Sequence, residues 1–156
     1  MLDPIKCFRL TNLCLKSSSF RSADDISERV INEDEAIVQT RRWVEHRFVM
    51  RDIDDVRQKF LQVTVNLGTR LLSPSQDEDG EHETLYTVEA SFLVEFVVLS
   101  DDFSEGGLQE FADRNAAHVA WPFWRQHVAS TLQAASLPVL QVPLMAQVIK
   151  PTTDQN

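Results

Sequence analysis

The stretch that decides the fold class is Ala120-Trp121-Pro122-Phe123-Trp124-Arg125-Gln126, followed a helix-length later by Ala135-Ser136-Leu137-Pro138-Val139-Leu140-Gln141-Val142. Proline is tolerated in the first turn of a helix, because its missing N–H would have no partner there. We therefore predict that a helix starts at Pro122 and ends shortly before Pro138. An apolar, extended tail is expected to run on to Met145.

The residues before this helix alternate between apolar and polar side chains, which is typical of half-buried strands. Four strands are predicted, over residues 5–16, 42–51, 56–72 and 84–100. Residues 17–36 are expected to form an irregular connection with a short helix near 23–31. Asp54 and Asp55 belong to a predicted turn between the second and third strands.

An acidic segment separates the last two predicted strands. Residues 73–83 contain a proline, a glycine and many carboxylates, which predicts a flexible hairpin loop. After the fourth strand, Ser104 is suited to cap a helix that leads toward Pro122. The tail 150–156 is polar, and we expect it to be disordered. The order of elements predicts an α+β fold: one domain over residues 1–156, with a four-stranded antiparallel sheet and a long C-terminal helix on one face.

The bulk composition excludes several classes of protein. A chain of 156 residues with a formal net charge of −9 lacks the basic patches that nucleic acid requires. No apolar run approaches the length of a membrane span, and the N-terminus has no signal-peptide pattern. The only cysteines are Cys7 and Cys14, which on one strand would point to opposite faces. We expect a cytoplasmic protein with reduced thiols.

No constellation of residues predicts catalysis, a metal site or a cofactor. The four histidines share no metal-ligand spacing, and no phosphate-binding loop or nucleophile elbow occurs. Glu95 lies in an apolar run, and we expect it either to face solvent at an edge or to pair with a buried arginine. The chain is thus predicted not to be an enzyme. Its surplus aromatics either complete the core or line an exposed recognition groove.

Three segments carry a resemblance to a known family. They are residues 120–126, residues 135–142, and Asp54-Asp55-Val56 leading to Leu61-Gln62-Val63-Thr64-Val65. In these segments the chain resembles the SecB family of bacterial export chaperones, including SecB-like relatives attached to toxin–antitoxin systems. The resemblance implies a homotetramer, built as a dimer of dimers, that holds unfolded clients without ATP. Those clients are preproteins or an antitoxin.

The same resemblance assigns candidate site residues. It implies a client groove lined by two sets of residues, one from the strand before the Asp-Asp turn and one from the predicted helix start: Trp43, Val44, Phe48 and Met50, with Trp121, Phe123 and Trp124. Glu89 is the acidic residue retained for docking on the SecA translocase motor, whereas the matching first-strand positions, Cys14 and Ser18, are uncharged. The alternative function is a structural adaptor or small-ligand carrier with a closed apolar cleft.

Overall fold

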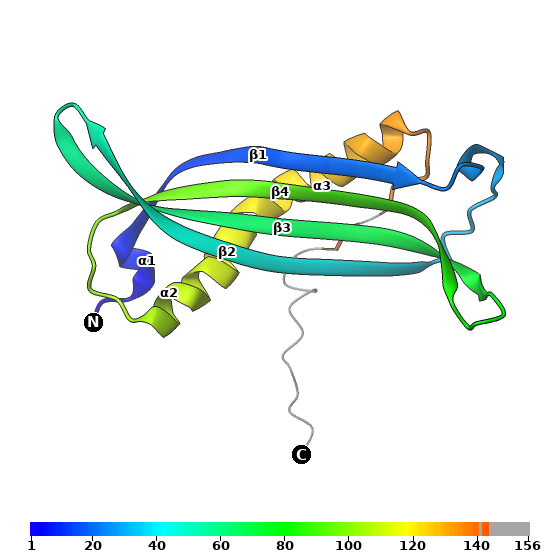
Figure 1. Cartoon of the computed structure of the whole chain (residues 1–156), viewed down its shortest axis with the longest axis horizontal. Coiled ribbons are helices and arrows are strands. Elements are labelled where there is room, and N and C mark those ends of the chain that lie inside the picture. Colours follow the sequence, from blue (N-terminus) through cyan, green and yellow to red (C-terminus); the bar gives the residue numbers. More distant parts are fainter. Residues whose placement is uncertain (141, 144–156) are drawn as a thin grey trace, which may run out of the picture.

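The chain folds into one antiparallel sheet backed by helix (Figure 1). The computed structural model describes residues 1–140, 142 and 143. The sheet has the strand order β1-β4-β3-β2, so β1 and β2 form its two edges. Its strands are β1 (Phe8–Ser22), β2 (Ile37–Ile53), β3 (Val56–Gln76) and β4 (His82–Val98). This architecture confirms the predicted α+β fold.

A long helical stretch follows the last strand and crosses one face of the sheet (Figure 1). It consists of α2 (Glu105–Phe111), the π-helical turn η2 (Ala112–Ala116) and α3 (Ala117–Ala134). The hydroxyl of Ser104 accepts a hydrogen bond from the backbone N–H of Gly107 at 3.0 Å, which confirms the predicted cap. Two short helices, α1 (Pro4–Cys7) and η1 (Ile26–Glu28), complete the elements.

The predicted helix start at Pro122 is wrong. Pro122 lies inside α3, which begins at Ala117 and continues the helix that Ser104 caps. A proline in a helix interior removes the hydrogen bond to the carbonyl four residues earlier. Here that carbonyl belongs to His118, and both His118 and Pro122 have exposed side chains. Pro122 therefore lies on the solvent side of the helix, where a carbonyl that lacks its usual donor can bond to water.

Several other boundaries also differ from the prediction, among them the start of β2, which lies at Ile37 rather than at residue 42. Residues 4–7 are helical rather than extended, because Pro4 begins a turn whose Ile5 N–H donates to the carboxylate of Asp3 at 3.1 Å. The first strand continues to Ser22, because its antiparallel pairing with β4 continues as far as Ser22 opposite Tyr86. In the segment 73–83, β3 runs to Gln76 and β4 starts at His82, so the hairpin tip is much shorter than predicted.

The hairpin between β2 and β3 has a two-residue turn. Asp54 and Asp55 both adopt positive φ, 50° and 63°, and Ile53 pairs with Val56 across them. Positive φ at both central residues is the pattern of a type I′ turn, whose twist matches that of the flanking strands. Aspartate tolerates this backbone region better than most side chains, which confirms the turn that the composition predicts.

The hydrophobic core lies between α3 and the two central strands. Side chains at alternate positions of β3 and β4 face the helix, in rows such as Val63 beside Val94 and Val65 beside Phe92. The helix α3 contributes both small and large side chains to this core. Its buried residues are Ala117, Ala120, Trp121, Trp124, Val128 and Leu132. The opposite, outer face of the sheet carries no helix (Figure 1).

Candidate functional site

The helix leaves part of the sheet uncovered on each side. It packs over β3 and β4, so the edge strands retain exposed apolar side chains on their helix-facing side. On β2 these are Val38, Phe48 and Met50, with exposed fractions of 48%, 36% and 47%, and the half-buried Val44 lies between them. We call these four residues the β2 margin. Their even numbering places them on one face of the strand.

Phe48 occupies the end of this margin near the start of the helix. Its ring stacks on that of Phe103, with centroids 6.2 Å apart. The ammonium group of Lys59 lies 4.5 Å from the centroid of the Phe48 ring and also forms an ion pair with Asp101 at 2.7 Å. The apolar margin therefore ends at a charged rim, which is the usual arrangement of a protein-binding surface.

Two of the three tryptophans that were predicted to line the groove lie in the core. Trp121 is 6% exposed and Trp124 only 2%, so neither offers its ring to a client in this structure. Trp124 stacks on His127 with ring centroids 6.3 Å apart, and Phe92 approaches the same imidazole edge-on. Burial lowers the pKa of His127, because the charged imidazolium loses hydration there.

Phe123 is half exposed but lies on the other side of the helix. Ser130, two helical turns further on, lines a shallow hollow together with Phe20 of β1. Positions 123 and 130 share a helix face, so Phe123 belongs to the side of the molecule bounded by β1. Exposed Leu10 and Leu15 also lie on the helix-facing side of β1. We call Leu10, Leu15 and Phe123 the β1 margin.

Trp43 points to the outer face of the sheet, because neighbouring residues on a strand alternate. Its ring lies against the guanidinium of Arg41, 4.7 Å from the ring centroid. The same guanidinium pairs with the carboxylate of Glu89 at 2.8 Å. The seven predicted groove residues thus occupy four places: the β2 margin (Val44, Phe48, Met50), the core (Trp121, Trp124), the β1 margin (Phe123) and the outer face (Trp43).

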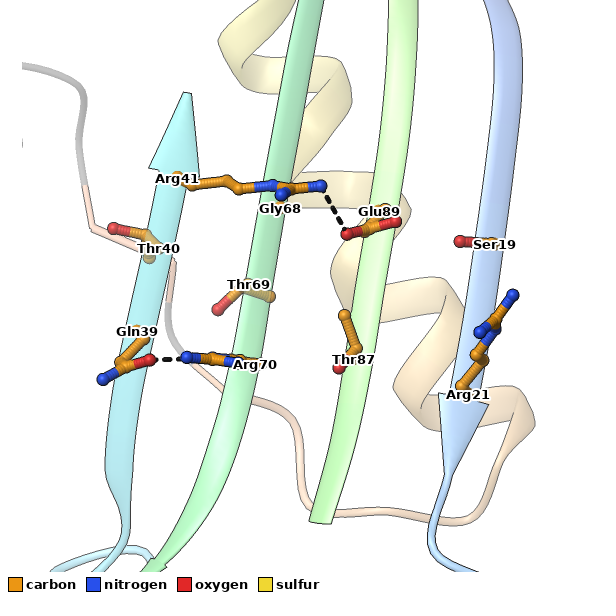
Figure 2. A pocket seen from close by; sticks show the side chains of 10 residues that line it. All are labelled: Ser19, Arg21, Gln39, Thr40, Arg41, Gly68, Thr69, Arg70, Thr87 and Glu89. Carbon is orange, nitrogen blue, oxygen red and sulfur yellow. Dashed lines mark hydrogen bonds and ion pairs between the residues drawn. The ribbon is translucent and has the colours of Figure 1, made fainter. Parts of the chain in front are cut away.

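The chain returns along the helix after Ala135. The indole N–H of Trp121 donates to the carbonyl of Pro143 at 2.9 Å, and the Arg125 guanidinium donates to the carbonyl of Val142 at 3.1 Å. Leu137, Leu140 and Val142 pack against the core. Figures 1 and 2 both draw this return segment behind the β2 side of the sheet. Residues 144 and 145 of the predicted extended tail, and the predicted disordered end 150–156, lie outside the described residues.

Glu95 pairs with an arginine, as one of the two predicted alternatives has it, but the arginine is exposed rather than buried. It lies on the central strand β4, where its carboxylate pairs with Arg51 and accepts a hydrogen bond from Gln62 at 2.9 Å. Burial alone would raise the pKa of Glu95, but the bonds from Arg51 and Gln62 outweigh it and lower the pKa. Arg51 also lies over the ring of Phe60 at 4.0 Å. The group is a structural pair that ties β2 to the two central strands.

A polar pocket on the outer face is the feature that sequence reasoning missed. It is lined by side chains from all four strands, among them Arg21, Arg41 and Arg70 (Figure 2). These residues are far apart in the sequence and share no motif, so only the strand order brings them together. The alternation of side chains along each strand was the one available signal for which residues share the outer face.

Two further properties bear on the class of protein. Within residues 1–140, 142 and 143, no three His, Cys, Asp or Glu side chains gather in a group that would hold a metal ion. None of the helices described is long and apolar enough to cross a lipid bilayer. Cys7 is buried in α1 and Cys14 is exposed on β1, and both are free thiols. Cys7 therefore does not share a strand with Cys14.

Comparisons with known proteins place this fold beside a chaperone. No family model matches the chain, and no curated protein matches it. Among solved structures, it is similar to the Mycobacterium tuberculosis Rv1957 SecB-like chaperone in complex with a ChAD peptide from the Rv1956 HigA1 antitoxin. The TM-score is 0.64 at 13% sequence identity, over 92% of this chain and 94% of that chain. The chain therefore has a SecB-like fold.

Proposed function

We propose that this protein is an ATP-independent holdase chaperone that binds unfolded or aggregation-prone clients on the β2 margin. The observation that carries the proposal is the pair of exposed apolar side chains Phe48 and Met50 on one face of an edge strand, with the exposed Val38 further along the same face. Exposed apolar surface of this kind marks a binding site. The flexible, polarizable side chain of Met50 suits a surface that accepts many sequences.

The edge position of β2 adds a second means of attachment. An edge strand offers unpaired backbone N–H and C=O groups, and an extended client segment can add to the sheet there. Backbone bonds do not depend on the client's sequence, while the apolar margin selects for hydrophobic segments. Unfolded chains supply both features. The structural neighbour's antitoxin peptide supports a client of this type.

We propose that the client is an antitoxin or a preprotein, and that the protein acts in the cytoplasm as a homotetramer. Of the two clients, we favour the antitoxin, because Glu89 is occupied by Arg41 and is flanked by further arginines on the outer face. A docking surface for the SecA motor built on acidic residues would require free carboxylates at this place. Clients bound at several margins of one assembly would gain affinity through multivalency.

Suppression of aggregation tests the proposal. The purified protein is mixed with a chemically denatured model protein on dilution, and light scattering is followed. We expect the wild-type chain to suppress aggregation and the Phe48→Asp/Met50→Asp variant to lose most of that activity, because a charge on the margin disfavours apolar clients. Val30→Asp is the matched control, since Val30 is an equally apolar and fully exposed residue away from the margin.

Circular dichroism must show that the double variant is folded. Full suppression by a folded Phe48→Asp/Met50→Asp variant would show that the β2 margin is not the client site. The alternative of a carrier with a closed apolar cleft predicts a different result: a monomer that neither suppresses aggregation nor brightens an environment-sensitive apolar dye.

A further inference from the structure

The outer face of the sheet has the opposite charge to the rest of the chain. Strand register places six arginines on this face and three glutamates, although the whole chain has a net charge of −9. The arginines are Arg9, Arg21, Arg41, Arg47, Arg51 and Arg70, and the glutamates are Glu45, Glu89 and Glu95. Such a basic field in an acidic protein attracts anionic groups and orients them during encounter.

The polar pocket lies where this positive charge is least compensated. One row across the sheet reads Gln39, Arg70, Thr87 and Arg21, and the next contains Arg41, Gly68, Glu89 and Ser19. Among the residues that the structure describes, Glu89 is the only carboxylate that lines the pocket, and it is paired with Arg41. Arg70 bonds only to the neutral amide of Gln39, at 2.7 Å. Arg21 has no ion pair within the described chain, and Figure 2 shows its side chain without a bonded neighbour.

A buried donor without a partner lies beside this pocket. Asn66 is 8% exposed, and its Oδ1 accepts a hydrogen bond from Ser91 at 2.6 Å, but its Nδ2 has no partner in this structure. Asn66 lines an adjoining hollow that shares Ser19, Arg41 and Glu89 with the pocket. A buried donor left unpaired is costly, so the site favours a ligand that brings a hydrogen-bond acceptor.

We propose that this outer-face pocket docks an acidic, extended segment of a partner protein. The guanidinium groups of Arg21 and Arg70 would bind its carboxylates, and Asn66 Nδ2 would donate to an acceptor on the same segment. Trp43, stacked on Arg41, forms an apolar wall at one end. The proposal does not depend on the β2 margin, which lies on the helix-facing side of the sheet.

The spacing of the arginines defines the ligand. Arg21 and Arg70 are two strands apart in one row, so their Cα atoms are separated by roughly 10 Å. In a segment with the extended polyproline II conformation, side chains three positions apart lie on the same side and are also separated by roughly 10 Å. Carboxylates at every third position of a segment that crosses the strands therefore match the two guanidinium groups.

Fluorescence anisotropy with a short labelled peptide of repeating Glu-Ser-Ser tests the proposal. We expect binding that weakens with added salt, and no binding of the matching Gln-Ser-Ser peptide. Arg21→Gln/Arg70→Gln should weaken binding at least about tenfold, because two charge-assisted contacts are lost. Glu89→Gln should strengthen it, since the only opposing carboxylate is removed. Arg57→Gln, at an exposed arginine in the β2–β3 hairpin, should bind like the wild type.

Several outcomes would overturn the proposal. Equal binding by the wild type and a folded Arg21→Gln/Arg70→Gln variant would remove the site, as would tighter binding of a single-stranded DNA oligomer of the same charge. A salt-sensitive dimer that is lost in the double variant, with no peptide binding, would assign the face to a second copy of this chain. Suppression of aggregation should be unchanged in the double variant, which separates this proposal from the holdase activity.

Discussion

At the residue scale, neighbouring side chains of the aromatic segment 120–126 have opposite environments. Trp124 is 2% exposed, whereas Phe123, one position earlier, is 50% exposed. Composition alone predicts a cluster of aromatics here, but not which ring enters the core. That choice depends on the rotational phase of the helix against the sheet. The phase is set by the small residues Ala117 and Ala120, which let the helix approach closely.

His127 gives a residue-scale prediction about pH. Burial lowers its pKa below the ordinary value of 6.5, so the folded state binds fewer protons than the unfolded state once the pH falls below that value. We expect the free energy of unfolding to decrease as the pH falls from 7 through the mildly acidic range. Denaturant titrations of the wild type and His127→Gln measure this slope, and the variant should show a smaller one.

The titration of Glu95 does not contribute to the pH dependence of stability in this range. The pKa of Glu95 lies below its ordinary value of 4.5, so its stabilising effect is present above that value and is lost only at lower pH. A pH slope in the mildly acidic range that is identical in the wild type and in His127→Gln would show that this histidine does not couple folding to pH.

At the element scale, the ends of the strands were harder to predict than their existence. Alternating side chains correctly located the third and fourth strands, because these bury one or both faces. The second strand was also located by its alternation, although its side chains are exposed or half-buried. The strands extend beyond their predicted ends where pairing with a neighbouring strand continues. For example, β1 continues to Ser22, which lies opposite Tyr86. Polar residues such as Ser17 and Ser19 face solvent there, so no local hydrophobic pattern marks that extension.

Pro122 gives an element-scale prediction. Its position in the interior of α3 leaves the carbonyl of His118 without an intrahelical donor. Pro122→Ala should restore that bond and raise the free energy of unfolding by about 1 to 2 kcal/mol, after the proline's restriction of the unfolded chain is allowed for. Denaturant unfolding measures the change.

Gln126→Ala, at an exposed position of the same helix, is the control and should change stability by less than about 0.5 kcal/mol. If Pro122→Ala lowers stability instead, the proline has a packing role that its exposure does not show.

At the scale of the whole molecule, each surface of the sheet has a different character. The helix-facing side carries two apolar margins, and the outer side carries the arginine-rich pocket. The fold class could be predicted from the sequence, because apolar periodicity and the quoted proline motif carry that information, whereas the client groove stays a prediction. The difference between the apolar and the arginine-rich surfaces could not be predicted from the sequence. It arises from the strand order, which places β1 beside β4 although most of the chain separates them.

The proposed assembly leads to a prediction about mass. Leu10 and Leu15 on the edge strand β1 are about half exposed and lie on the same side of the molecule as Phe123, so we expect this margin to be covered by a second copy. Light scattering should give the wild type a mass above that of the monomer. Leu10→Asp/Leu15→Asp should lower it, while Val56→Asp, an exposed control at the β2–β3 hairpin, should not. A wild-type monomer would contradict the assembly.

The strand order also determines when β1 can join the sheet during synthesis. A ribosome releases β1 first, yet its partner β4 is the last strand to emerge, because Phe8 pairs with Val98. For most of synthesis the fifteen residues of β1 have no ladder to join, and Leu10, Leu13 and Leu15 are exposed to other nascent chains. Until β4 is complete, the nascent chain of this proposed chaperone therefore exposes apolar side chains of the kind that it is proposed to bind in its clients.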